Sequence, residues 1–553
     1  MDVMCAIINT LWSGACSSDY QRYRRALNHP GAEQRRLLMH YVRENAETEY
    51  GRRFGFTSLR SVSEYQDRVP LTTFDDYQPY VERIQAGDRQ VLTRAPVRRL
   101  VPSSGSTRAQ KLTPFTGGLQ SEFSRAVRAW ILDLYCHYPT LAGGPAYWSI
   151  SPVLPVETLG PSAVPIGFDE DTAYLGGFWK PLIDATMAVP SALRFIQDMD
   201  AFRYATLLFL VRANELRLIS VWHPSFLTLL LDDLPRHWAS ILHDLAAGTI
   251  TTPVRLPDRG KIALRPWLRP ARQRAAELMR ISPDDYQRIW PKLKLITCWA
   301  DAHAALGVAG LRRRFEAVTV QPKGLIATEA FVTLPFADQK PVAIRSHFFE
   351  FLADDGSVHL VDELDVGGEF SVVVTTGGGL YRYRLHDRIR VDSYLERTPS
   401  LTFLGKEDHV CDRFGEKLSA GFVGAVLQRL FGQCKIRPSF AMLAPEMNAG
   451  RWGYMLFVET NEALPSGLAD GLEAMLRENP HYRYCVRLGQ LLPVRVCETL
   501  PGAFSRYVAE LRRRGQRTGN IKPSPLDTSP GWVSILGDRR GPRPGHGAGL
   551  RAR

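Results

Sequence analysis

The ten residues SSGSTRAQKL occupy positions 103–112 and follow a short apolar stretch, residues 97–101, that contains two arginines. The apolar stretch predicts a β-strand, and the periodicity of residues 119–134 predicts a helix after the loop. Small hydroxyl residues around a glycine let backbone amides and hydroxyl groups converge on phosphate oxygens, and a following lysine, here Lys111, offsets their charge. The order of residues is not that of a Walker loop. Between a strand and a helix, where doubly wound sheets bind ligands, the segment indicates a phosphate-binding site; an ordinary surface loop is the alternative.

The segments on either side of this loop predict an α/β protein. Upstream, residues 6–15 and the helical pattern of residues 19–49, interrupted at Pro30-Gly31, predict scaffold helices. Downstream, helical stretches alternate with short strands, a pattern typical of a largely parallel sheet. These strands are expected at residues 216–221, 294–299 and 317–320. Two later strands, at residues 346–352 and 369–375, flank an Asp-Asp-Gly turn and predict a mixed or antiparallel subdomain.

The pattern restarts beyond residue 404. A helix at residues 420–431, a strand at 453–459, a helix at 464–479 and a strand at 491–497 predict a compact α+β domain of ~120 residues. We therefore expect a large amino-terminal α/β domain with mixed sheets at residues 1–403 and a smaller, mobile carboxy-terminal domain at residues 404–528. Residues 529–553 are rich in Gly, Pro and Arg, and we expect them to be disordered.

Composition narrows the function classes. The chain has 553 residues, of which 45% are hydrophobic and 23% charged, so most of it is expected to fold as a soluble protein. The formal charge of +12 arises mainly from scattered arginines. It therefore indicates a solvated surface and a site for a small polyanion, and we expect no nucleic-acid partner.

The cysteine spacing and the lengths of the apolar runs bear on two questions, whether the chain binds a structural metal and where in the cell it is located. The eight cysteines lack zinc-ligand spacing, which predicts free thiols in a reducing cytoplasm. The amino terminus lacks the basic start of a secretory signal, and the apolar runs are far shorter than the ~20 residues that span a bilayer. We expect a cytoplasmic protein with no membrane partner.

Three further segments carry polar residues suited to a nucleotide. In GLIATEA, residues 324–330, the apolar-flanked Glu329 needs a partner or a cation, and a carboxylate suits Mg²⁺ on a triphosphate. Thr328 adds a hydroxyl; an arginine partner for Glu329 is the alternative. In YRYRLHDR, residues 381–388, the two oxygens of Asp387 suit a ribose diol, whereas an Asp/Arg surface ladder is the alternative and His386 is expected to be structural. The third segment, LGKEDHV to FGEKL at residues 404–418, contains Lys406 and Lys417, two of only 11 lysines.

Together these segments resemble, in order and spacing, the motifs of the Gretchen Hagen (auxin-responsive) acyl acid-amido synthetases, which belong to the adenylate-forming superfamily. The resemblance extends from the amino-terminal helices to Pro523. It implies that ATP and Mg²⁺ are bound. The phosphates would be held by Ser103, Ser104, Gly105, Ser106 and Thr107, with Lys111, Thr328 and Lys406 nearby. Glu329 would bind the metal and Asp387 the ribose. Lys417 and Lys522, in the mobile domain, are implied to reach the phosphate and the reacting carboxylate.

The implied reaction joins a carboxylic acid to an amine, most simply that of an amino acid, through an acyl-adenylate. Aromatic and aliphatic residues after the loop are candidates for the acyl pocket, although core packing explains them too: Trp179, Phe226, Phe331 and Val332. Leu325, Ala330 and His386 depart from the motifs of the plant members. Two alternatives stay open, namely an acyl-thioester ligase of the same superfamily and a non-catalytic ligand-binding descendant.

Overall fold

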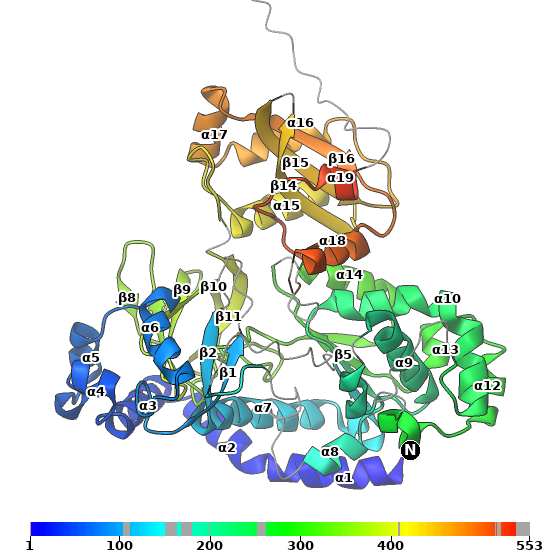
Figure 1. Ribbon diagram of the computed structural model, residues 1–553, viewed down its shortest axis with the longest axis horizontal. Helices are drawn as coiled ribbons and strands as arrows, with labels where there is room; N and C mark the ends of the chain where they lie inside the picture. Colours follow the sequence, from blue (N-terminus) through cyan, green and yellow to red (C-terminus); the bar gives the residue numbers. More distant parts are fainter. Residues whose placement is uncertain are drawn as a thin grey trace, which may run out of the picture. The chain divides into compact units, whose positions relative to one another are not determined.

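The computed structural model describes residues 2–102, 111–149, 163–167, 180–196, 198–251, 262–302, 304–407, 410–448, 450–514, 516, 521 and 523–537. Two compact units make up the chain (Figure 1). The first comprises Met1–Trp299, Leu311–Leu385 and Ile389–Phe403, and the second comprises Ala300–Gly310, His386–Arg388 and Leu404–Arg553. Each unit is described separately below.

The first unit begins with six helices: α1 (Val3–Ala15), α2 (Ser17–Ala26), α3 (Pro30–Glu44), α4 (Glu49–Arg53), α5 (Val62–Arg68) and α6 (Phe74–Gln85). The predicted break between helices is confirmed, and Pro30 occupies the first turn of α3, where a missing N–H is tolerated. A capping box between Thr73 and Asp76 starts α6. The buried faces of these helices belong to the main hydrophobic core of the unit.

The strand at residues 97–101 is observed as β1 (Val97–Pro102), which pairs antiparallel with β2 (Leu112–Thr116). Helix α7 (Gly117–His137) follows at once, and the Thr116 hydroxyl caps it by accepting the Leu119 N–H at 3.1 Å. The prediction that the phosphate loop lies between a strand and a helix was therefore wrong in one respect. The loop joins two antiparallel strands, and the helix starts only after β2, because five buried residues of β2 complete the strand pair first.

The predicted parallel sheet is confirmed. Its four strands lie in sequence order and are all parallel: β3 (Ala146–Trp148), β4 (Leu218–Ser220), β5 (Leu295–Cys298) and β6 (Thr319–Pro322). All residues of β4 and β5 are buried, as is typical of parallel strands covered on both faces. The connections contain α8 (Lys180–Ala185), α9 (Met199–Arg212), α10 (Pro224–Ala247), α12 (Arg272–Leu278), α13 (Tyr286–Ile289) and α14 (Ala304–Arg314), and α9, α10 and α12 flank the sheet (Figure 1).

A second sheet contains five strands in the order β11-β10-β9-β7-β8. Its members are β7 (Phe348–Leu352), β8 (Val358–His359), β9 (Glu369–Thr375), β10 (Tyr383–Leu395) and β11 (Thr398–Lys406). Strand β7 pairs antiparallel with both β8 and β9, so the antiparallel subdomain predicted around the Asp-Asp-Gly turn is confirmed. Buried residues from β7, β9 and β10 join the same core as the amino-terminal helices.

The second unit contains a three-stranded sheet of order β14-β15-β16, formed by β14 (Phe440–Asn448), β15 (Arg451–Glu459) and β16 (Leu492–Glu498). Alternate residues of the central strand face opposite sides, as the period of a strand requires. Leu456 packs with α15 (Ala420–Cys434), α16 (Leu468–Leu476) and α17 (Pro480–Arg487), whereas Phe457 packs with α18 (Ala503–Arg513) and α19 (Val533–Leu536). Two short strands, β12 (Val410–Cys411) and β13 (Leu418–Ser419), pair before α15.

Both units combine helices with sheets, which confirms the predicted α/β class. Within the part of the chain that the structure describes, no helix has both the length and the apolar composition required to cross a bilayer.

Candidate functional site

The segment GLIATEA forms a short hairpin that presents Thr328 and Glu329 at its tip. Ile326 pairs antiparallel with Phe331, and the Ala327 N–H donates to the Ala330 carbonyl at 2.9 Å. Gly324 starts the hairpin with φ +78°, and a Cβ there would lie 2.6 Å from the Thr333 hydroxyl oxygen, so only glycine fits. The sequence therefore builds a tight turn at a fixed place after β6.

The Glu329 carboxylate is half-buried at this tip. Among the described residues it makes no hydrogen bond or ion pair, so the predicted alternative of an arginine partner finds no support. The same residues contain no group of three or more His, Cys, Asp or Glu side chains that could hold a metal by themselves. A lone carboxylate fits Mg²⁺ because this ion commonly keeps one or two protein ligands and completes its shell with phosphate oxygens and water.

A buried polar network fixes the base of this hairpin. The Phe331 N–H donates to His347 Nε2 at 3.0 Å, so His347 carries its proton on Nδ1, which lies 2.9 Å from Glu122 Oε2. The side chains of His347 and Glu122 are 0% and 2% exposed. Glu122 belongs to α7 and also accepts hydrogen bonds from the Tyr41 hydroxyl, at 2.8 Å, and the Gly377 N–H, at 3.0 Å.

This network, which we call the Glu122–His347 network, joins α3, α7, the hairpin and the turn after β9. We had not predicted it. A signal exists for Glu122, which shares the buried face of α7 with Leu119 and Phe123. An acidic residue at helical spacing within an apolar face requires internal partners.

The segment YRYRLHDR starts with a structural anchor. Arg382 is buried with φ +49°, and its Nε lies 3.1 Å from each carboxylate oxygen of Glu350. Its guanidinium also donates to the carbonyls of Gln66 and Val69, both at 2.8 Å. Burial raises the pKa of Glu350, and the charge of Arg382 opposes this shift. The arginine therefore fixes the start of β10.

Asp387 and Lys406 form an ion pair within the second unit. Lys406 Nζ lies 2.8 Å from Asp387 Oδ1, and the side chains are 37% and 2% exposed respectively. The predicted ribose ligand is thus an almost fully buried carboxylate whose first partner is another predicted site residue. One carboxylate offers about four lone-pair sites, so this pairing leaves acceptor capacity for hydroxyl groups.

His386 adopts φ +57°. This left-handed conformation is one that glycine adopts without steric cost, whereas other residues rarely adopt it. The His386 carbonyl accepts the Glu407 N–H at 2.8 Å, and its Nδ1 lies 3.8 Å from Glu407 Oε2. His386 therefore lies in a backbone turn that is closed by Glu407, which supports the structural role predicted for His386.

Lys417 is exposed on a turn of the second unit and has φ +46°. The preceding Glu416 is 0% exposed and accepts the N–H groups of Arg413 and Phe414, at 3.0 and 2.8 Å, and the Tyr454 hydroxyl at 2.6 Å. A buried carboxylate thus shapes the turn that presents the lysine. The Lys417 carbonyl accepts a hydrogen bond from the Asn479 side chain at 3.1 Å.

Several predicted site residues lie outside the described residues, namely Ser103, Ser104, Gly105, Ser106, Thr107, Trp179 and Lys522. Lys111 is half-buried directly before β2. Of the predicted acyl-pocket residues, Phe226 is half-buried in the first turn of α10. Phe331 and Val332 are 2% and 0% exposed and belong to the main core, where ordinary packing accounts for them.

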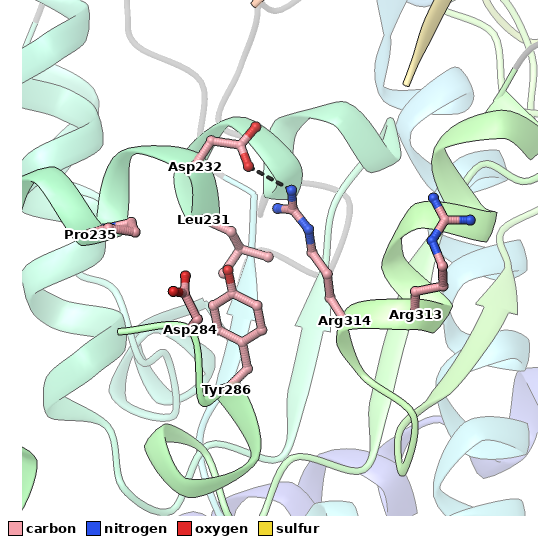
Figure 2. Close-up of a pocket in the computed structure, with 7 residues that line it drawn as sticks. All are labelled: Leu231, Asp232, Pro235, Asp284, Tyr286, Arg313 and Arg314. Carbon is pink, nitrogen blue, oxygen red and sulfur yellow. Dashed lines mark hydrogen bonds and ion pairs between the residues drawn. The ribbon is translucent and has the colours of Figure 1, made fainter. Parts of the chain in front are cut away.

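A surface hollow with a volume of about 470 Å³ lies elsewhere in the first unit. Figure 2 shows Asp232 paired with Arg314 at 2.7 Å, with Asp284, Tyr286 and Arg313 around them. None of the predicted site residues lines this hollow. Its charged and open lining does not suit an apolar acid.

Four of the cysteines are poor nucleophiles. All eight are free, as predicted. Burial raises the pKa of Cys5, Cys16 and Cys298 to about 12, and that of Cys411 to about 11. A thiol attacks as the thiolate, and these shifts keep the thiols protonated at neutral pH.

Comparison with known families defines the class of protein. Three sequence models match in order along the chain: the GH3 family N-terminal domain over residues 19–320, the GH3 family central domain over residues 341–406 and the GH3 family C-terminal domain over residues 426–530. The chain therefore belongs to the GH3 (Gretchen Hagen) family, and the predicted resemblance is confirmed.

Curated relatives and solved structures agree with this assignment. The chain is 27% identical over 424 residues, which cover 67% of it and 68% of the relative, to the probable indole-3-acetic acid-amido synthetase GH3.12 of Oryza sativa subsp. japonica. It is 25% identical to the indole-3-acetic acid-amido synthetase GH3.8 of Oryza sativa subsp. indica, covering 92% of this chain and 90% of the relative. Its fold matches the structure of the GH3.15 acyl acid amido synthetase with a TM-score of 0.79 and 19% identity, over 91% of this chain and 93% of the other.

Proposed function

We propose that this protein is an ATP-dependent acyl acid-amido synthetase, a ligase that adenylates a carboxylic acid and then transfers the acyl group to the amine of an amino acid. The observation that carries the proposal is the ordered match to all three GH3 domains. The Glu329 hairpin supports it, because it presents a carboxylate without an internal partner among the described residues at the position of the family's glutamate motif.

The first step is attack of the substrate carboxylate on the α-phosphorus of ATP, which expels pyrophosphate and leaves an acyl-adenylate. Glu329, with Thr328 beside it, would hold Mg²⁺, which when bound would supply positive charge against the negative charge on the phosphate oxygens. Residues 103–107 and Lys111 bind the phosphates, and Asp387 accepts hydrogen bonds from the ribose hydroxyls. Lys406, which pairs with Asp387, sets the orientation of that carboxylate.

In the second step the amine attacks the acyl carbon, the bond to phosphate breaks, and AMP leaves with the electron pair. The amine nitrogen releases one proton to solvent water in this step. No covalent intermediate on the protein is required, in agreement with the protonated cysteines. The proposed roles of Lys417 and Lys522 are to place positive charge beside the phosphate and the reacting carboxylate, which stabilises charge that develops in the transition state.

The test is ATP–pyrophosphate exchange with a panel of aryl, indole and fatty acids, followed by product identification after amino acids or coenzyme A are supplied. Acid-dependent exchange and an amide product support the proposal. A coenzyme A thioester as the only product assigns the chain to thioester ligation, and absence of exchange with every acid assigns it to non-catalytic binding. Asp387→Asn should raise the KM for ATP about tenfold through loss of a charged hydrogen-bond acceptor. Asp392→Asn, a change at an aspartate elsewhere on the same strand, is the matched control.

A further inference from the structure

A buried lysine stands among tryptophans at one edge of the parallel sheet. Lys323 directly follows β6 and is 3% exposed. Its Nζ lies 4.5 Å from the ring centre of Trp222, 5.9 Å from that of Trp148 and 6.0 Å from that of Trp130. We call these four residues the Lys323 cluster. A fourth aromatic residue, Trp299, extends it, because its ring centre lies 5.5 Å from that of Trp222.

The cluster lies where open α/β sheets bind ligands. Trp148 ends β3, Trp222 comes two residues after β4, and Lys323 comes directly after β6. These strands are parallel, so all three residues lie at the carboxyl edge of the sheet. Ligands of such sheets bind in the crevice outside this edge. Trp148 and Trp222 are half-buried, so their rings keep accessible surface beside the buried ammonium.

The chemistry of the cluster specifies a type of ligand. Indole faces stabilise a cation through their quadrupole, and they also provide flat apolar surfaces for a planar ring. The same positive charge in surroundings of low dielectric attracts an anionic group more strongly than an exposed lysine does. A ligand with a flat aromatic body and a negatively charged end matches both properties.

The hairpin separates this cluster from the predicted metal ligand. Leu325 is hydrogen-bonded to Val332 and Thr333 at the base of the hairpin, whereas Glu329 lies at the tip. An extended strand rises roughly 3.3 Å per residue, so the hairpin places Glu329 on the order of 10 Å beyond its base. Lys323 precedes the base. The ammonium is therefore suited to an anionic group at the far end of a substrate whose reacting carboxylate lies near Glu329.

We propose that the Lys323 cluster forms the far end of the acyl-acid pocket and selects aromatic acids that carry a second anionic group. This inference rests on the proposed function, because it assumes that one carboxylate of the substrate is adenylated near Glu329. It adds the substrate class, an aromatic dianion, and a specificity-determining residue, Lys323.

The experiment compares matched pairs of acids in ATP–pyrophosphate exchange: benzoate against isophthalate and terephthalate, and phenylacetate against 4-carboxyphenylacetate. In the unmodified protein the dianionic member of at least one pair should have a kcat/KM roughly tenfold higher or more, the range expected for a hydrogen bond to a charged group. Lys323→Met should abolish this preference by lowering kcat/KM for the dianionic acid roughly tenfold more than kcat/KM for the monoanionic acid. Lys294→Met is the matched control, because Lys294 is exposed at the opposite, amino-terminal end of β5.

A second readout separates this inference from the proposed function. Quenching of tryptophan fluorescence by the same acids, without ATP, reports binding near the cluster, and Trp222→Leu should weaken binding of both members of a pair. If no acid supports exchange but the dianions quench and Lys323→Met prevents it, the proposed function fails and the binding site stands. If monoanions and dianions behave alike in both assays, or if Lys323→Met changes neither ratio, the inference is overturned. Lys323→Arg, which keeps the charge, should retain the preference and serves if the methionine variant does not fold.

Discussion

His347 Nδ1 lies 2.9 Å from Glu122 Oε2, although the two residues are 225 positions apart in the sequence. Both side chains are buried, and the other ring nitrogen of His347 accepts the Phe331 N–H two residues after Glu329. The pair therefore connects α7, which follows the predicted phosphate loop, to the hairpin that carries the predicted metal ligand. Because Nε2 accepts the Phe331 N–H, the proton on Nδ1 is the one that His347 donates to Glu122.

Glu122→Gln should destabilise the first unit by about 3 kcal/mol, because an amide places an N–H group against the Nδ1 proton of His347 and leaves a buried polar group unpaired. Urea unfolding measures this loss. The Mg²⁺ concentration that gives half-maximal pyrophosphate exchange should also rise, since the hairpin loses its anchor. Glu82→Gln, at an exposed position of α6, is the control. A normal Mg²⁺ requirement in a destabilised Glu122→Gln protein would limit the pair to a stabilising role.

Glu329→Gln should leave the stability of the protein almost unchanged but impair pyrophosphate exchange. The carboxylate has no internal partner among the described residues, so the free energy of unfolding should change by no more than about 0.5 kcal/mol. Pyrophosphate exchange should fall about a hundredfold through loss of charge stabilisation at the phosphates. Retention of exchange at the original Mg²⁺ concentration would remove Glu329 from the metal site.

The left-handed backbone of His386 predicts a contrast between two substitutions. Glycine adopts φ +57° without strain, so His386→Gly should keep ATP binding and change stability by less than about 1 kcal/mol. His386→Val should cost about 2 kcal/mol, because a β-branched residue is strained in this region, and should raise the KM for ATP by displacing the adjacent Asp387. Equal stability of the valine and glycine variants in thermal unfolding would contradict the strained turn.

The raised pKa of Asp133 predicts how the free energy of unfolding depends on pH. Burial raises the pKa of this carboxyl to about 6, and its Oδ2 accepts the Ala337 N–H at 3.1 Å. Because the folded pKa lies above the unfolded value, the native state holds the proton more tightly. The associated stabilisation is complete below the unfolded pKa and is lost as the pH rises through about 6.

Asp133→Asn removes this titration. The stability of the variant relative to the unmodified protein should therefore rise by about 2–3 kcal/mol between pH 4 and pH 8. Urea unfolding across this range measures the difference. Asp284→Asn is the control, since it leaves Asp133 and its surroundings unchanged. A pH-independent difference between Asp133→Asn and the unmodified protein would show that the buried carboxyl does not titrate in this range.

The fold was largely predictable where local pattern and tertiary environment agree. Three of the short strands of the parallel sheet, β4, β5 and β6, were predicted within a few residues, because strands buried on both faces are continuous apolar runs. The three-residue β3 was not predicted. Strand β14 was missed. Its sequence FAMLAPEMN includes Pro445, which disfavours a central strand. Among the described strands β14 pairs with β15 alone, and the isolated bridge on its other side, Leu443–Leu526, comes before Pro445, so the missing N–H is tolerated.

The candidate site was predictable only in part. The residue types of Glu329 and Asp387 indicated their chemistry, but no local pattern places Lys406 on Asp387 or His347 on Glu122, since both contacts depend on how distant segments fold together. Pairing of residues 112–116 with β1 likewise depends on a tertiary contact, which is why the loop was expected to lead straight into a helix. The left-handed turn at His386 could not be predicted, because a histidine in the sequence does not indicate a positive φ, whereas a glycine does.

The three-stranded sheet of the second unit is covered on both faces by helices of that same unit. Its apolar interior is therefore complete without help from elsewhere in the chain. Evolution can therefore vary the residues of this module while the packing inside the first unit stays the same.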